Sequence, residues 1–329
     1  MRIPKKALLL AVQRGLDVVK TFSTTLYTGN GSTQTITNGI DLAGEGGLVW
    51  IKARSGVSGI NDHQLIDSLR GGFNKLSSNL TSRQTSNGNL ISAFNRDGFS
   101  LAGGSGVANG DATYASWTFR QAPKFFDIVQ YAGDGVAGRQ IAHDLGVAPG
   151  MMIVKSTNGT TGWFVYHQNA SASGRFARNA YGVLNNTAAF ANDTNAWQDT
   201  DPTSTDFTVG LNSNQSGLTY IAYLFAHDPS DSGIIQCGSF VNMSPGQTVN
   251  LGWQPQYIMV KRTDGADNWV VIDTARGFSE NDDRYLFPNS SQGESGGVGA
   301  SSLTPTATGF KFDTTYSGIY IYMAIKAPE

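Results

Sequence analysis

Lysine, aspartate and arginine recur in one order along the chain, and such side chains can do acid–base or electrostatic chemistry. The set occupies seven positions: Lys52, Asp67 and Arg70, then Lys155, then Lys261, Asp273 and Arg276. After Lys155, His167 takes the place of the aspartate and no arginine follows at the third place. Catalysis needs a base or a nucleophile beside such a set, and the set that begins with Lys155 is not even complete. We therefore interpret these residues as a structural network near a strand end and predict no catalytic residue.

Acidic residues gather in the middle of the chain, where they could bind a cation. The stretch from 192 to 206 is rich in carboxylates and amides, and its candidate ligands are Asp193, Asp199, Asp201 and Asp206. Oxygen ligands of this kind suit Ca²⁺. The spacing is not that of an EF-hand, however, and loops built from Asx turns have the same composition. Calcium is therefore a candidate, and an ordinary loop is the interpretation we favour; no metal site is firm.

Three tryptophans could contact sugars. Trp163 and Trp269 begin matching apolar strands, and Trp197 lies in the acidic stretch. Aromatic faces beside Asn and Asp would suit a lectin-like surface. The alternative is that these rings belong to the core or its rim, and we favour that alternative for Trp163 and Trp269. Trp197 is the more open candidate for a glycan contact.

Two further motifs resemble catalytic or nucleotide-binding signatures, but their surroundings do not fit. The glycines at 133, 135 and 138 match a dinucleotide fingerprint, which must open a helix; here a strand-like segment follows. The segment 293–297 matches a nucleophile elbow, which needs an apolar strand before it; here it lies in a polar loop. A glycan depolymerase would need a pair of carboxylates in a groove, and only Asp199, Asp201 and Asp206 are crowded enough to test.

The composition excludes several classes of protein. Glycine accounts for 40 of 329 residues, and charged residues make up 15%, against roughly 25% in ordinary domains. The net charge of −2 gives no electrostatic footprint for nucleic acid. A single cysteine excludes a disulfide within the chain and a zinc site built from cysteines, and four histidines argue against a His-rich metal centre. No apolar run is long enough to span a membrane, and no cofactor is expected.

Internal periodicity organises the sequence. Three apolar runs of five residues end in the lysines at 52, 155 and 261, about 100 residues apart. Each run is followed by a short apolar strand, then by an Asn (Asn79, Asn186 and Asn289), then by a Phe and a Tyr-led strand. We predict an all-β protein of three tandem β-sandwich repeats, jelly-roll or lectin-like, over 20–124, 125–229 and 230–329. Residues 1–19 are predicted to form a short helix or arm that anchors the chain to a partner.

The ordered motifs resemble those of structural proteins of tailed bacteriophages. The resemblance rests on Leu48–Lys52, Leu65–Gly71, Gly98–Leu101 and Thr113–Trp117, and on the final strand Tyr320–Ile325. It covers about residues 20–329, and it brings no catalytic residues with it. Such proteins are tail-fibre-like or other virion components.

The resemblance implies a non-enzymatic virion protein, a tail fibre or a tail-attached appendage that contacts the host surface. Its expected partners are other virion proteins, copies of itself (a trimer in a fibre) and host surface glycans, with no nucleic acid and no membrane. Expected alternatives are a capsid decoration or tail-adaptor protein, or a free carbohydrate-binding module. The tail is favoured over the head as its location.

Overall fold

The computed structural model is built almost entirely from antiparallel β-strands, which confirms the predicted all-β sandwich class. The residues that it describes are 15–55, 62–86, 90–170, 177–243, 245–279, 282–296 and 303–329. The described helical segments are short: η1 (Val18–Lys20), η2 (Ala177–Asn179), α1 (Thr194–Trp197) and η3 (Leu211–Ser213). Most of the predicted N-terminal arm, residues 1–14, lies outside the described residues.

The strands fall into three successive groups, which we call module 1, module 2 and module 3. Module 1 contains β1 (Phe22–Thr28), β2 (Gln34–Thr37), β3 (Gly47–Ser55), β4 (Gln64–Asp67), β5 (Asn74–Lys75), β6 (Thr85–Ser86), β7 (Ile91–Asn95), β8 (Gly98–Leu101) and β9 (Thr113–Arg120). Module 2 contains β10 (Phe126–Ala132), β11 (Arg139–Ala142), β12 (Pro149–Ser156), β13 (Phe164–His167), β14 (Ala180–Val183), β15 (Ala191–Asn192), β16 (Asp206–Val209) and β17 (Thr219–Ala226). Module 3 contains β18 (Ile235–Asn242), β19 (Gln247–Asn250), β20 (Pro255–Arg262), β21 (Val270–Asp273), β22 (Tyr285–Leu286), β23 (Leu303–Thr306), β24 (Gly309–Phe312) and β25 (Gly318–Lys326).

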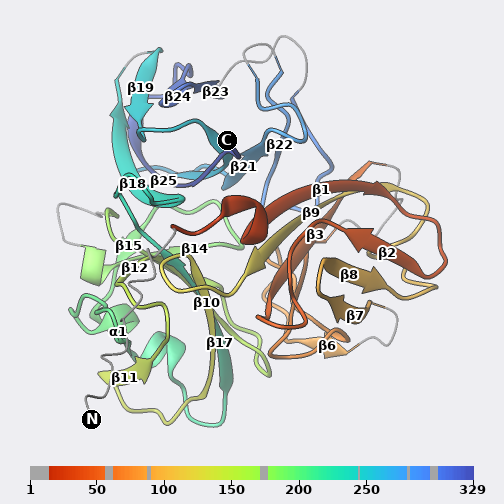
Figure 1. The fold of residues 1–329 in the computed structure, drawn as a ribbon. Coiled ribbons are helices and arrows are strands. Elements are labelled where there is room, and N and C mark those ends of the chain that lie inside the picture. Colours follow the sequence, from red (N-terminus) through yellow and green to blue (C-terminus); the bar gives the residue numbers. More distant parts are fainter. Residues whose placement is uncertain are drawn as a thin grey trace, which may run out of the picture.

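One strand order is found in all three modules. The larger sheets run β1-β9-β3-β4, β10-β17-β12-β13-β14-β15 and β18-β25-β20-β21-β22. The smaller sheets run β2-β8-β7, β11-β16 and β19-β24-β23. The three groups form three lobes around the middle of the molecule (Figure 1). The predicted boundaries fall in the connections between β9 and β10 and between β17 and β18, while independent folding of each repeat stays a prediction.

The lysine-ending apolar runs become the strands β3, β12 and β20, which lie inside the larger sheets and are buried on both faces. Because side chains alternate along a strand, two different environments are needed to cover them. In β3, Val49 and Ile51 face the core of their own sandwich. Leu48 and Trp50 face a second core that contains residues of all three modules. The modules therefore pack around a common core and do not form a row.

An aromatic cluster lies where the three modules meet. The ring of Phe119 on β9 lies 5.5 Å from the rings of Phe126 and Phe225 of module 2, measured between centroids. It lies 6.0 Å from the ring of Tyr257 of module 3, and that tyrosine also contacts Phe22. Aromatic pairs at such separations add to the stabilisation that comes from burying their area. Phe119 is thus a shared contact of all three modules.

Replacing Phe119 by Ala should destabilise the whole chain, because the cavity would open in the shared core. We expect a loss of about 3–5 kcal/mol in the free energy of unfolding, measured by urea denaturation with tryptophan fluorescence. Phe73, half exposed in module 1, gives the control, and Phe73→Ala should cost less than about 0.5 kcal/mol. Equal losses for the two variants would contradict the assignment of Phe119 to a common core.

Candidate functional site

The three repeated lysines lie at the contacts between modules. Each is buried, and its ammonium group donates a hydrogen bond to a backbone carbonyl of a neighbouring module. The Nζ–O distances are 3.3 Å from Lys52 to Ser291, 3.2 Å from Lys155 to Thr81 and 3.3 Å from Lys261 to Thr187. Module 2 thus donates to module 1, module 3 to module 2, and module 1 to module 3. The three contacts form a closed cycle within one chain.

The loops that accept these bonds are held by an asparagine of their own module. The Oδ1 atoms of Asn79, Asn185 and Asn289 accept the backbone N–H groups of His63, Trp163 and Trp269 at 2.9–3.0 Å. In each loop the carbonyl that accepts the lysine lies two residues after the asparagine. The comparison of the three repeats in the sequence placed Asn186 in this position. The structure corrects it to Asn185, because the Asn185 side chain accepts the backbone N–H of Trp163.

His63 and the equivalent residues Trp163 and Trp269 make a second hydrogen-bonded contact between modules. The indole N–H of Trp163 donates to the carbonyls of Ser77 (3.1 Å) and Leu80 (2.9 Å) of module 1. The indole of Trp269 donates to Val183 of module 2 at 3.1 Å. In module 1 the equivalent residue is a histidine, His63, whose Nε2 lies 2.9 Å from the carbonyl of Phe287 of module 3.

Backbone hydrogen bonds join the modules in the opposite direction. The amides of Gln84, Phe190 and Glu294 donate to the carbonyls of Thr157, Thr263 and Arg54, with N–O distances of 2.7–2.9 Å. Gly293 precedes Glu294 in the segment that resembles a nucleophile elbow, and a Cβ there would lie 2.8 Å from the Arg54 carbonyl. The glycine in that motif therefore permits close approach of two backbones. The side chains of Arg54 and Glu294 add a bidentate ion pair (2.7 and 2.8 Å).

The aspartates and arginines of the repeated set form ion pairs away from the lysines. Arg70 Nε lies 2.6 Å from Asp67 Oδ2, and Arg276 Nε lies 2.6 Å from Asp273 Oδ2. Each aspartate also accepts a hydrogen bond from an aromatic residue of a neighbouring module. The donors are the hydroxyl of Tyr223 to Asp67 (2.8 Å) and the indole of Trp117 to Asp273 (2.9 Å). These pairs brace a strand end and satisfy buried charge.

The third contact of this type lacks both the aspartate and its aromatic partner. His167 replaces the aspartate, and Met323 occupies the place of Tyr223 and Trp117 on the last strand. His167 Nδ1 accepts the backbone N–H of Asn169, so its Nε2–H donates to the carbonyl of Tyr322 at 3.0 Å. The two changes occur together, and the histidine replaces an ionic contact by a neutral one.

Burial sets the electrostatics of this network. It lowers the pKa of Lys52, Lys155 and Lys261 to about 8, and Asp62 partly opposes this effect at Lys52, as Asp267 does at Lys261. Burial also lowers the pKa of His167 to about 4, although its bond to Tyr322 acts in the other direction. These groups contribute the hydrogen bonds and ion pairs that join the modules.

The tryptophans proposed as glycan contacts are buried. The exposed fractions of Trp163, Trp197 and Trp269 are 0%, 1% and 1%. The indole of Trp197 donates to the carbonyl of Ala180 at 3.0 Å and packs against Tyr166, inside module 2. Their burial confirms the interpretation favoured for Trp163 and Trp269, that these rings belong to the core. The glycan contact considered for the three tryptophans, with Trp197 the more open candidate, is wrong because no face of the rings is accessible.

The proposed calcium ligands are divided among separate local contacts. Asp193 caps α1 by accepting the amide of Asn195, and Asp206 accepts the hydroxyls of two threonines. Asp199 and Asp201 lie on either side of the Arg178 guanidinium, at 2.6 and 3.7 Å. Within the described ranges no group of three or more His, Cys, Asp or Glu side chains could hold a metal ion. The structure supports the alternative of a turn-rich loop.

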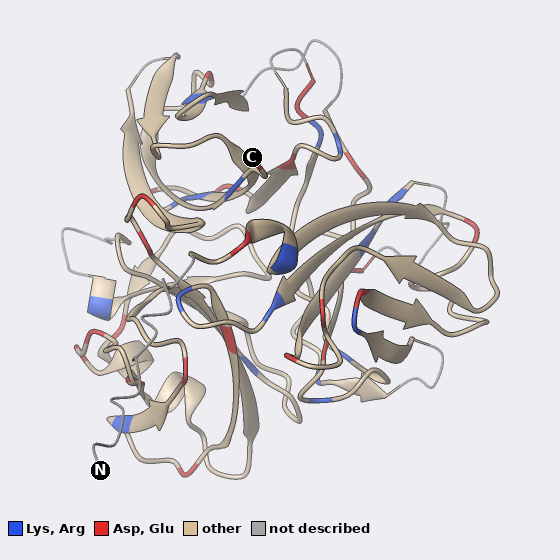
Figure 2. Cartoon of the chain, viewed as in Figure 1, with Lys and Arg blue, Asp and Glu red and all other residues tan. Residues whose placement is uncertain are grey.

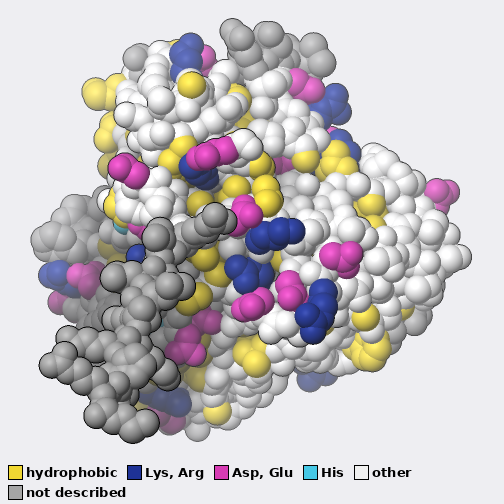
Figure 3. Space-filling model, viewed as in Figure 1, with side chains coloured by type: hydrophobic (Ala, Val, Ile, Leu, Met, Phe, Trp, Pro, Cys, Tyr) yellow, Lys and Arg dark blue, Asp and Glu magenta, His cyan; other side chains and the backbone are white. Residues whose placement is uncertain are grey.

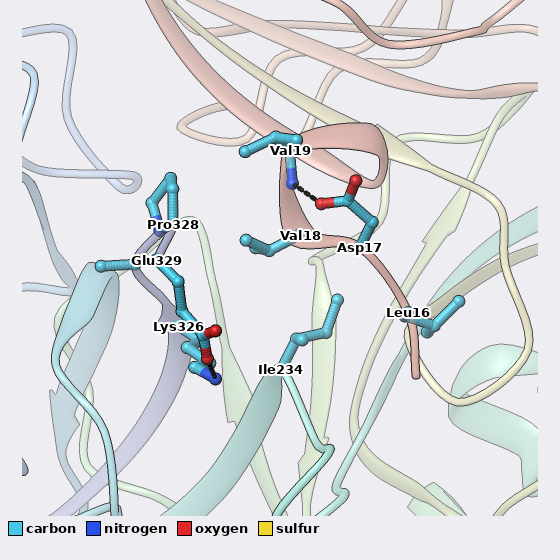
Figure 4. Close-up of a pocket in the computed structure, with 9 residues that line it drawn as sticks. Leu16, Asp17, Val18, Val19, Ile234, Lys326, Pro328 and Glu329 are labelled. Carbon is cyan, nitrogen blue, oxygen red and sulfur yellow. Dashed lines mark hydrogen bonds and ion pairs between the residues drawn. The ribbon is translucent and has the colours of Figure 1, made fainter. Parts of the chain in front are cut away.

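A cavity of about 300 Å³ lies where the first described residues meet the last strand. Its lining comes from residues 16–19, from Ile234 and from residues 326–329 (Figure 4). Asp17 caps η1 by accepting the amide of Val19, and Val18 belongs to the shared core. Figure 3 shows side chains of both charge signs together with hydrophobic ones around the middle of the same view. At this junction surface the first described residues, 15–19, lie against the folded modules.

Residues 17–328 match the family model described as a domain of unknown function, DUF7483. The match covers nearly the whole chain, so the chain belongs to this family. The comparison with curated proteins found no match. In the part of the chain that the structure describes, no helix has the length and apolar character needed to span a membrane.

Lys155 should make stability increase with pH on the alkaline side. Its pKa is about 8 in the folded chain and about 10.4 in the unfolded chain, so between these values the unfolded state binds more protons and raising the pH favours folding. We expect the free energy of unfolding of the wild type, relative to Lys155→Met, to rise between pH 7 and pH 9. Burial raises the pKa of Cys237 and acts in the opposite sense in both proteins, so the difference isolates the lysine. A constant difference would contradict the assignment.

His167 should make the fold sensitive to acid. Its folded pKa of about 4 is below the unfolded value of about 6.5, so stability is lost as the pH falls from 6.5 towards 4, by at most about 1.4 kcal/mol per pH unit. His167→Gln keeps a neutral donor for the Tyr322 carbonyl and does not titrate. Thermal unfolding at pH 7, 5.5 and 4.5 should therefore show a smaller acid loss for the variant. An identical loss in both proteins would contradict a buried neutral histidine.

Proposed function

We propose that the protein is a non-enzymatic structural component of a bacteriophage virion, a tail fibre or a tail-attached appendage. The observation that supports this most is how the repeated Lys, Asp and Arg residues are used: they fix the modules to one another. Buried charges that bond one module to the next favour a rigid structural role. The resemblance of its ordered motifs to tailed-phage proteins, over residues 20–329, supports the proposed location in a virion.

Residues 1–19 are proposed to anchor the chain to another virion protein. The junction surface supports this proposal, because residues 15–19 enter the folded modules there. The host surface would be contacted by parts of the modules that do not line this junction. We further propose self-association, as a trimer in a fibre, which would increase the avidity of weak host contacts. The molar mass from light scattering tests this last point.

A capsid decoration or tail-adaptor protein is the second candidate. The packing of the modules around a common core favours it, because three modules in a cluster span a shorter distance than three in a row. The charges are distributed in both signs over the chain (Figure 2), so neither candidate depends on a single strongly charged surface. A free carbohydrate-binding module is the remaining alternative.

Gold-labelled antibody on purified particles, viewed by electron microscopy, separates these candidates. We expect label on the tail. Label over the head would favour the decoration protein, and unlabelled intact particles would overturn the virion proposal and favour the free binding module.

Deleting residues 1–14 should abolish incorporation into particles and leave the modules folded. The deletion stops before Val18, because that side chain is buried in the shared core and its loss would confound the result. Incorporation is measured by quantitative immunoblot of purified particles, and folding by circular dichroism of the isolated protein. Normal incorporation of the shortened chain would exclude an anchor in these residues.

A further inference from the structure

The first strand of each larger sheet lies at an edge of that sheet, because β1, β10 and β18 each have a neighbouring strand on one side only. In Figure 1, β18 runs along the left side of the module 3 lobe. An edge strand presents a row of N–H and C=O groups with which a further strand can pair. In an antiparallel pair these groups alternate along the strand, so every second residue of β18 directs them away from β25.

The first half of the β18 edge is covered by module 2. The carbonyl of Ile235 accepts the amide of Asp228 at 3.0 Å. The amide of Cys237 donates to Nδ1 of His227 at 3.2 Å, and its carbonyl accepts a hydrogen bond from Nε2 of Gln168 at 2.8 Å. The odd-numbered residues of β18 are therefore those whose backbone groups point outward.

The second half of this edge is not covered. In the described parts of the chain, the outward N–H and C=O groups of Ser239 and Val241 have no hydrogen-bond partner. The side chains of Ser239, Val241 and Met243 are also exposed, by 53% at Val241 and 84% at Met243. No residue from 235 to 243 is charged. We call residues 239–243 the open edge.

Modules 1 and 2 cap the corresponding end of their edge strand. Thr28 and Ala132 are equivalent to Val241, because each pairs with the residue that precedes the repeated tyrosine of the last strand. The carbonyl of Thr28 accepts Nε2 of Gln34 at 3.2 Å, and the carbonyl of Ala132 accepts the guanidinium of Arg139. In both modules the cap is the first residue of the neighbouring strand of the smaller sheet.

Module 3 lacks this cap. The capping position, the first residue of β19, is Gln247, and its Nε2 donates to a carbonyl of its own strand at 3.3 Å. The carbonyl of Val241 is therefore left uncapped. Two residues further on, Met243 takes the place of the polar residues Asn30 and Asp134 of the other modules. Charged side chains are a usual protection of an edge strand against pairing, and the open edge has none.

The same strand of a second copy of the chain matches the open edge. Antiparallel pairing about a two-fold axis lets the outward groups of Ser239 and Val241 in one copy bond to those in the other. Such pairing brings identical residues close together, so a charged strand would repel its copy, whereas this strand is uncharged. Val241 and Met243 add an exposed apolar surface that the contact would bury. The contact would continue an edge that module 2 already pairs over its first half.

We propose that two copies of the chain associate through the open edge, so that the larger sheets of their third modules join into one sheet across a two-fold axis. The interface is isologous, because the same residues of both copies form it. This inference goes beyond the proposed function, because the contact needs no other virion protein and is separate from the trimer proposed for a fibre.

Light scattering after size exclusion, with the full chain over a range of concentrations, tests the proposal. We expect the molar mass to rise from one chain towards two, and amide hydrogen exchange in residues 235–243 to slow over the same range. Val241→Pro should weaken the association about tenfold, because the outward N–H is lost from both copies. Proline is tolerated at an edge position whose N–H faces solvent, and the bonds from β18 to β25 are kept.

Thr28→Pro is the matched control, because it removes the outward N–H at the equivalent position of module 1; the molar mass should equal that of the wild type. Val241→Lys places like charges across the two-fold axis and provides a second test if circular dichroism shows that the proline variant is unfolded. A wild type that stays monomeric at every concentration overturns the proposal and leaves the open edge to a strand of a different protein. An assembly whose mass is the same in Val241→Lys as in the wild type also overturns it.

Discussion

The larger sheet of every module has two apolar faces, and the module's own smaller sheet can cover only one of them. This constraint determines the rest of the structure. In β3, Val49 and Ile51 are covered from within the sandwich, and Leu48 and Trp50 must be covered from outside it. The same alternation occurs in β20, where Ile258 and Val260 face inward. Three such faces meet around Phe119. The modules must therefore associate, because each would otherwise expose an apolar face of its larger sheet to water.

Apolar packing alone would not fix how the modules are oriented, since it is not directional. The buried polar contacts supply direction. Each lysine reaches a carbonyl in a defined loop, and each loop is positioned by one asparagine. A misplaced module would remove from each buried ammonium group its acceptor in the neighbouring module, which carries a cost in a low-dielectric interior. The contacts between modules thus favour one arrangement over others that bury a similar area.

The sequence predicts the strands better than it predicts their surroundings. Alternation and spacing are local properties, so the all-β class and the central position of the lysine-ending strands follow from them. The apolar strands that Trp163 and Trp269 begin already favour rings in the core or its rim, but the sequence of one repeat does not show that the indole N–H groups bond to carbonyls of the neighbouring module. Asn185, and not Asn186, is the residue equivalent to Asn79 and Asn289, and only the hydrogen bond from the Trp163 backbone N–H to Asn185 Oδ1 shows this.

Each contact between modules joins a donor side of one module to an acceptor side of the next, which makes it heterologous. Contacts of this kind either close into a ring or continue without limit. Here they close after three modules within a single chain, at the contact between Arg54 and Glu294. A chain opened at that contact carries one unused side of each kind, and each side fits a second opened chain. A domain-swapped assembly would therefore use the same contacts as the closed chain, and the bidentate ion pair at the closing contact favours the closed chain.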